Sequence, residues 1–218
     1  MAFEKITEEP SLYDNLEEKP VREILEEIND EDSKIVPAVR KTIPQIEKLV
    51  ESIVPKMKRG GRIFYIGAGT SGRLGVLDAS EIPPTYGMPP SFIIGLIAGG
   101  DFALRNAVEN AEDDYDKGWE ELQEHDISEN DTLIGIAASG TTPYVIGALH
   151  HAREHKILTA CITSNPGSPL AAEADIFVVI GTSLAVYPAA SLVRCVRPEM
   201  PVYVVDPGRP AIRGIRKP

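Results

Sequence analysis

Apolar residues in the first sixty positions of the chain recur with the spacing of an α-helix. One set lies within residues 21–28, and a second covers three turns between residues 46 and 57. Gly60 and Gly61 follow the second set, and glycine is typical of a helix end. We therefore expect residues 1–60 to form an N-terminal helical arm. Its apolar stripe either packs on its own domain alone or docks also on a second subunit.

Beyond the glycine pair the pattern changes to short apolar runs that are separated by helical stretches. The helical stretches include residues 102–111 and 143–154. Strands that alternate with helices predict right-handed crossovers and helices on both faces of the sheet. The expected fold class is α/β, with a doubly wound, mainly parallel sheet. The predicted strands are residues 62–66, 92–96, 132–137, 157–162 and 176–180.

The last part of the chain differs in composition from the rest. Residues 176–193 contain no charged side chain and have the length of a membrane span. Glycine and proline within this run favour a buried strand, a turn and a short helix instead, with a further strand at residues 202–205. Residues 194–218 hold six basic residues, two acidic residues and five prolines. We expect a sheet domain at residues 61–180 and a divergent tail at residues 181–218 that adds a helix and a strand.

The charge balance restricts the partners of the chain. It carries 33 acidic and 22 basic residues, with a net charge of −11. This balance disfavours binding to nucleic acid or to an anionic membrane, but it allows a small anionic ligand held by a few backbone groups. Cys161 and Cys195 follow no metal spacing, and the charged N-terminus predicts no signal peptide. We therefore expect a cytoplasmic protein.

The loop after the first predicted strand has the composition of a phosphate-binding turn. Residues 67–73 read GAGTSGR and precede a helix, whose free N–H groups and dipole favour an anion. Gly69, Thr70 and Ser71 are the candidate binding residues. The pattern is formally GxGxxG, but a dinucleotide site also needs an acidic residue at the end of the second strand, which reads GLIAGG at residues 95–100. This favours a phosphosugar, with a nucleotide as the alternative.

Two later loops repeat this chemistry. The third predicted strand is followed by Ser139, Thr141 and Thr142, and a proline then begins a helix. Simple capping would use one hydroxyl, so three hydroxyls favour phosphate binding. Ser164 follows the fourth strand in a weaker echo. Because parallel strands end at the same edge, these loops predict one hydroxylated, phosphorylated ligand.

Two glutamates are candidate acid or base groups. Glu81 is expected to end the helix after the first strand, in an apolar stretch followed by two prolines. Glu112 is expected to end the next helix, in an acidic run from which composition alone would not select it. His151 and His155 share a helix face, but no further ligand accompanies them, so we expect no metal site.

Three motifs resemble the signature of bacterial N-acetylmuramic acid 6-phosphate etherases. They are GAGTSGRLGVLDASE at residues 67–81, GLIAGG at residues 95–100 and GIAASGTTPY at residues 135–144. The resemblance covers about residues 1–175. It implies a sugar-isomerase (SIS) fold, a cytosolic homodimer, a role in amino sugar catabolism and peptidoglycan recycling, and no metal or redox cofactor. The implied reaction cleaves the lactyl ether of N-acetylmuramic acid 6-phosphate to N-acetylglucosamine 6-phosphate and D-lactate. Glu81 matches the proton donor of the family and Glu112 its second acid/base.

The resemblance to etherases ends near Asp175. Residues 175–190 resemble the late NAD-binding strand and loop of sirtuin deacylases, and residues 201–207 resemble the strand that follows. The zinc cysteines and the catalytic histidine motif of sirtuins are missing, so we expect no deacylase activity. The C-terminal region of the etherases is also missing, which predicts sugar-phosphate affinity with weak or absent turnover. The alternatives are a non-catalytic phosphosugar-binding module and an NAD- or other nucleotide-binding domain.

Overall fold

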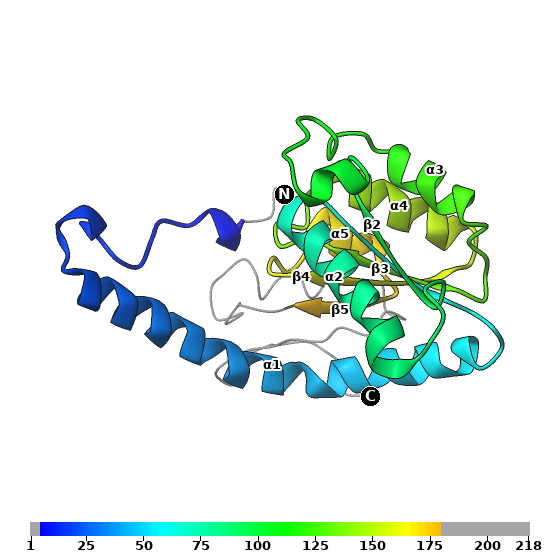
Figure 1. Ribbon diagram of the computed structural model, residues 1–218, viewed down its shortest axis with the longest axis horizontal. Coiled ribbons are helices and arrows are strands. Elements are labelled where there is room, and N and C mark those ends of the chain that lie inside the picture. The colour runs from blue at the N-terminus through cyan, green and yellow to red at the C-terminus, as the bar shows by residue number, and fades with distance from the viewer. Residues whose placement is uncertain (1–4, 180–218) are drawn as a thin grey trace, which may run out of the picture.

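The computed structural model describes residues 5–179 of the chain. Within them a parallel sheet lies between two layers of helices, and one long helix extends to the side (Figure 1). The expected strand at residues 202–205 and the tail at residues 181–218 lie outside the described residues.

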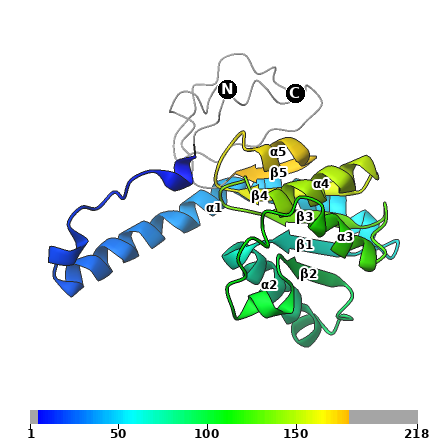
Figure 2. The same cartoon turned by 90° about the horizontal axis from the view of Figure 1, so that it is seen from above.

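The five strands form one sheet with the order β2-β1-β3-β4-β5, in which every neighbouring pair is parallel (Figure 2). The predicted doubly wound α/β fold is confirmed. Each predicted strand agrees with an observed one to within one residue at either end, because apolar runs of this length fit strands covered on both faces. The strands are β1 (Ile63–Gly67), β2 (Ile93–Ile97), β3 (Thr132–Ile136), β4 (Leu158–Thr163) and β5 (Ile176–Val179).

One face of the sheet is covered by α3 (Lys117–Glu124), α4 (Pro143–Glu154) and α5 (Pro169–Glu173). The main core lies here, where Phe64 and Leu133 of the sheet pack against buried side chains of these three helices. The predicted helix at residues 143–154 is confirmed at both ends. The apolar side chains on one side of this helix are buried, and their packing provides most of the stability of the helix.

The other face is covered by α1 (Val21–Met57) and α2 (Gly69–Tyr86). Leu49 and Ile53 of α1 form a second buried cluster with the sheet, so the stripe does pack on its own domain. The helix ends where the glycine pair predicts, and Gly60 adopts a φ of +90° with its amide on the Met57 carbonyl.

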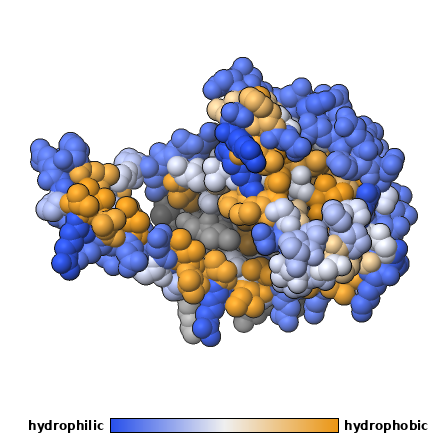
Figure 3. Space-filling model, in the orientation of Figure 1, coloured by the Kyte–Doolittle hydropathy of each residue, from blue (hydrophilic) through white to orange (hydrophobic). Residues whose placement is uncertain are grey.

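The first half of α1 projects beyond the sheet as an arm, and apolar side chains reach the surface along it (Figures 1 and 3). The exposed apolar side chains of α1 are Val21, Leu25, Ile28, Ile35, Val36, Val39, Ile43, Ile46, Val50 and Val54.

No helix within residues 5–179 is both long enough and apolar enough to cross a bilayer.

The prediction of a helix at residues 102–111 is wrong. Only a short 3-10 turn, η3 (Asp101–Leu104), forms there, and turns follow it. The Arg73 guanidinium of α2 donates to the carbonyls of Ala103 (2.9 Å) and Leu104 (3.1 Å). In a continuing helix these carbonyls would instead accept hydrogen bonds from amides four residues later in the chain. Glu112 therefore lies in a turn rather than at a helix end.

The prediction that α2 ends at Glu81 is also wrong. The helix continues through Pro83 and Pro84 to Tyr86, and Gly87 caps it with a φ of +67°. The two prolines therefore lie in the last turns of the helix instead of stiffening a loop.

Candidate functional site

The site lies where the strand order reverses. The chain leaves β1 through α2 on one face of the sheet and reaches β3 through α3 on the opposite face. Gly67 at the end of β1 pairs in register with Ile136 at the end of β3, so the loops that follow begin at the same level. Ligands of open parallel sheets bind in the crevice at such a point.

We use the word crevice for the space between the loop that follows β1 and the loop that follows β3, and its first side, or wall, is the start of α2. The helix begins directly after β1, and Gly69 takes a φ of +51° in its first turn with Thr70 and Ser71. A Cβ at Gly72 would lie 2.7 Å from the Gly67 carbonyl oxygen, so only glycine allows the helix to begin this close to the strand. The N-cap residue is Ala68, whose side chain has no oxygen to accept a hydrogen bond from the first amides of the helix. The positive end of the helix dipole therefore points into the crevice.

The second wall is the loop between β3 and α4. Thr142 is the N-cap of α4, as predicted, but its side chain makes no capping hydrogen bond. The hydroxyl of Ser139 accepts hydrogen bonds from the Thr141 amide (3.3 Å) and the Thr141 hydroxyl (3.0 Å). The structure therefore brings the Ser139 and Thr141 hydroxyls together, next to Thr142 at the start of α4.

The loop after β4 holds the second wall in place. The Ser164 amide donates to the Ala138 carbonyl (3.0 Å), and the Thr163 hydroxyl donates to the same carbonyl (3.2 Å). The Asn165 side chain donates to the Ser139 carbonyl (3.0 Å). The Ser164 backbone thus has a structural role, and its side chain is half-buried next to the Ser139 loop.

Sequence reasoning missed Asn165, Thr163 and Arg73. The first two are buried polar residues, and Arg73 organises the turns that lead to Glu112. The run TSNPG at residues 163–167 marks a turn but does not indicate which of its side chains faces inwards.

Glu112 lies close to the second wall. Its backbone carbonyl accepts a hydrogen bond from the Tyr144 amide in the first turn of α4 (3.0 Å). Its side chain is exposed. The structure therefore brings Glu112 beside the Ser139 loop, although the predicted helix that was to carry it does not form.

Glu81 is not brought to the crevice of its own chain. It is exposed on α2, ten residues after Ser71, which corresponds to about 15 Å along the helix axis. Leu74 and Leu77 share its helix face and are 57% and 58% exposed.

Two tyrosines near the walls remain protonated. Burial and the neighbouring Asp78 carboxylate raise the pKa of Tyr65 in β1 to about 12. Burial and a hydrogen bond to Glu121 also raise the pKa of Tyr144, which links α4 to α3. Neither phenol is therefore a candidate base at neutral pH.

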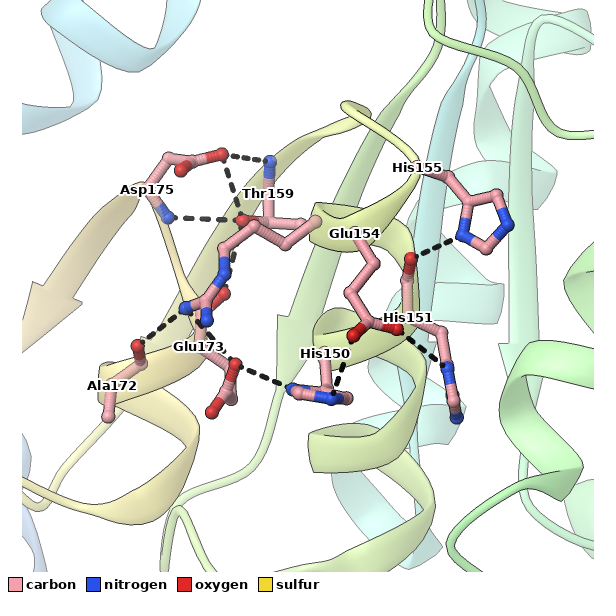
Figure 4. A network of polar contacts seen from close by, with 9 residues as sticks. His150, His151, Glu154, His155, Thr159, Ala172, Glu173 and Asp175 are labelled. Carbon is pink, nitrogen blue, oxygen red and sulfur yellow. Dashed lines mark hydrogen bonds and ion pairs between the residues drawn. The ribbon is translucent and has the colours of Figure 1, made fainter.

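The histidines of α4 lie at the other end of that helix, away from Thr142. His150 contacts Glu173 of α5 (3.2 Å) and Glu154 (3.6 Å) (Figure 4). His151 contacts Asp116 (3.2 Å), so these side chains tie neighbouring segments together. Within residues 5–179, no group of three or more His, Cys, Asp or Glu side chains is arranged to hold a metal ion.

Comparison with known proteins extends the likeness seen in the motifs. The chain is 77% identical over 175 residues to an N-acetylmuramic acid 6-phosphate etherase of Bacteroides fragilis, and the match covers 80% of the chain and 62% of that protein. It is 72% identical over 183 residues to the etherase of Bacteroides thetaiotaomicron, covering 83% of the chain and 66% of that protein. The chain thus spans less than two thirds of these relatives. The expected likeness over about residues 1–175 is confirmed, whereas the sirtuin-like tail stays a prediction.

Solved structures share the fold at low sequence identity. A phosphoheptose isomerase from Francisella tularensis has a TM-score of 0.58 at 20% identity, covering 79% of this chain and 95% of that chain. The sugar isomerase domain of the RpiR transcription factor from Sphaerobacter thermophilus has a TM-score of 0.51 at 18% identity, covering 73% and 75%.

Two family models match overlapping parts of the chain. A SIS domain model matches residues 119–194. The model of the glucokinase regulatory protein N-terminal SIS domain matches residues 45–153, half of the chain, and takes in both walls of the crevice. Together with the strand order, this match shows that the chain belongs to the SIS domain family.

Proposed function

We propose that the chain binds N-acetylmuramic acid 6-phosphate and cleaves its lactyl ether, giving N-acetylglucosamine 6-phosphate and D-lactate. The observation that carries this proposal is the 77% identity to an etherase over the segment that contains both walls of the crevice. The helix start at Gly69, Thr70 and Ser71 and the hydroxyls of Ser139, Thr141 and Thr142 would bind the phosphate and the sugar. Ser164 would border the same site.

The chemistry needs only proton transfers and water. In the open-chain sugar the aldehyde acidifies the proton on C2, and a carboxylate can remove it. A protonated carboxyl then supplies a proton to the lactate oxygen as the bond to C3 breaks, and water adds to the unsaturated product. The reaction is redox-neutral, so the proposal includes no redox cofactor, and because carboxyl groups carry the proton transfers it includes no metal.

The positions of the two glutamates support a homodimer. Glu112 lies beside the Ser139 loop, whereas Glu81 is about 15 Å along α2 from Ser71. The exposed Leu74 and Leu77 give the Glu81 face of α2 an apolar character that fits a subunit contact. We propose that Glu81 of the partner subunit completes each site, and that the exposed apolar side chains of α1 contribute to the same assembly.

The proposed organisation follows the sequence. Residues 1–60 would act as a helical arm, residues 61–180 as the phosphosugar-binding domain and residues 181–218 as a divergent tail. We place the protein in the cytoplasm, which is consistent with the free and buried Cys161.

One observation favours a second function, that of a non-catalytic phosphosugar-binding module. The candidate binding loops follow β1 and β3, which are neighbours in the sheet, whereas Glu81 lies about 15 Å along α2 from Ser71, so one chain alone would bind the ligand without turning it over. Release of D-lactate by the purified chain separates the two functions. Glu112→Gln should abolish any release, and mixing Glu81→Gln with Glu112→Gln chains should restore part of it if the sites are shared between subunits. Release that survives Glu112→Gln would contradict the assigned role.

A further inference from the structure

The N-terminal end of the described chain lies against the loop after β4, although the two are far apart in the sequence. The 3-10 turn η1 (Ile6–Glu8) is attached there through the side chain of Asn165. The Asn165 Oδ1 accepts hydrogen bonds from the Ile6 amide (2.8 Å) and the Thr7 amide (3.4 Å). Its Nδ2 donates to the Thr7 hydroxyl (3.0 Å) and to the Ser139 carbonyl (3.0 Å).

Asn165 is fully buried, and its side chain uses both amide hydrogens and accepts two hydrogen bonds through Oδ1. This arrangement fixes the orientation of the amide group, because Oδ1 faces two donors and Nδ2 faces two oxygens. A buried amide is costly to leave without partners. The side chain therefore holds its position fully only when η1 and the Ser139 loop are both in place.

The backbone of Asn165 is fixed from the same side. Its amide donates to the Thr163 hydroxyl (3.2 Å), which in turn donates to the Ala138 carbonyl (3.2 Å). Thr163 and Asn165 thus hold two successive carbonyls of the loop whose Ser139 hydroxyl faces the Thr141 side chain. A shift of η1 would act on this loop through one rigid, buried group.

We propose that η1 forms part of the phosphosugar site, and that Asn165 is a positioning residue that couples the docking of η1 to the Ser139 loop. This inference rests on the proposed phosphosugar function and goes beyond it, because it assigns a role to the N-terminal turn. Coupling of this kind is reciprocal. A sugar phosphate that orders the Ser139 loop should also tighten the attachment of η1, and a weaker attachment should lower the affinity for the sugar phosphate.

Thr7→Val tests the coupling without touching the Ser139 loop. Thr7 is exposed, and the substitution removes only the hydroxyl that accepts from Asn165. Calorimetric titration with N-acetylmuramic acid 6-phosphate should show a dissociation constant about fivefold higher, the effect of losing one hydrogen bond. Thr7→Ser should restore binding to within about twofold of the original chain. The matched control is Ser11→Ala, because the Ser11 hydroxyl accepts a hydrogen bond from the Tyr13 amide of the same segment (3.1 Å).

Amide hydrogen exchange provides a readout that a merely structural role would not change. The Ile6 and Thr7 amides should exchange more slowly when the sugar phosphate is bound. In Asn165→Ala, provided that circular dichroism shows a folded chain, this ligand-dependent protection should disappear.

The outcomes separate this inference from the proposed function. If the original chain does not bind the sugar phosphate, both are overturned. If the chain binds it, but Thr7→Val binds equally well and the ligand leaves Ile6 and Thr7 exchange unchanged, the coupling alone is overturned.

Discussion

Gly140→Ala should destabilise the chain far more than an ordinary glycine substitution. Gly140 lies in the Ser139 loop with a φ of +66°. A Cβ at this position would lie 2.4 Å from the Cβ of Ser168, 2.2 Å from its hydroxyl and 2.9 Å from the Thr163 hydroxyl. Ser168 is fully buried and caps α5 through the Ala171 amide, so it has no room to move aside.

The expected loss follows from two separate costs. A left-handed backbone conformation costs a residue with a Cβ roughly 1–2 kcal/mol. Forcing an extra methyl group into a packed interior costs about 1–3 kcal/mol more. The sum is about 2–5 kcal/mol, a large part of the roughly 5–15 kcal/mol by which a typical domain is stable.

Urea unfolding of Gly140→Ala measures this sum, and Gly60→Ala isolates the first cost. Gly60 has a φ of +90°, and a Cβ there would have no atom within 4 Å, so only about 1–2 kcal/mol should be lost. Ser168→Gly in the Gly140→Ala background should recover about 1 kcal/mol or more, since it removes the main overlap and a glycine cap costs only a few tenths. Equal losses in Gly140→Ala and Gly60→Ala would refute the packing argument.

Further predictions concern the amino end of β3 and the ligand loop. Asp131→Ala should lower the free energy of unfolding by about 3–5 kcal/mol, because the Asp131 carboxylate is only 2% exposed and forms an ion pair with Arg62 (3.0 Å). Glu120→Ala is the control: Glu120 belongs to an exposed ion pair, so its loss should cost at most about 1 kcal/mol. Burial opposes ionisation of Asp131, but the hydrogen bonds from Arg62 and from the Ser128 amide, together with the Arg62 charge, outweigh it and hold its pKa below the usual value. This contribution should therefore be complete above about pH 4 and fade as the pH falls further, and urea unfolding of Asp131→Ala should lack that part of the acid dependence. Replacing Ser139 and Thr141 together with alanine should weaken sugar-phosphate binding by roughly 1–3 kcal/mol, and unchanged calorimetric affinity in the folded double variant would contradict their role.

Local patterns predicted the strands and the start of α4 because those elements depend on local chemistry. The apolar runs are buried on both faces, and Thr142 with Pro143 forms a helix start that tertiary contacts do not alter. The hydroxyl loops could be located for the same reason, since each directly follows a strand.

The features that sequence reasoning missed depend on contacts between distant residues. Arg73 takes the carbonyls that a helix at residues 102–111 would use, and no local pattern reveals that contact. The role of Asn165 depends on a segment more than 150 residues earlier in the chain. The separation of Glu81 from Ser71, in contrast, already follows from the helix predicted between them, because ten helical residues span about 15 Å.

The central claim is that the crevice between α2 and the Ser139 loop binds a phosphosugar. Calorimetric titration with N-acetylmuramic acid 6-phosphate, and with NAD as the competing ligand, tests it most directly. We expect saturable binding of the sugar phosphate at one site per chain, lost or strongly weakened when Ser139 and Thr141 are both alanine, and no binding of NAD. Binding of NAD without binding of the sugar phosphate would contradict it.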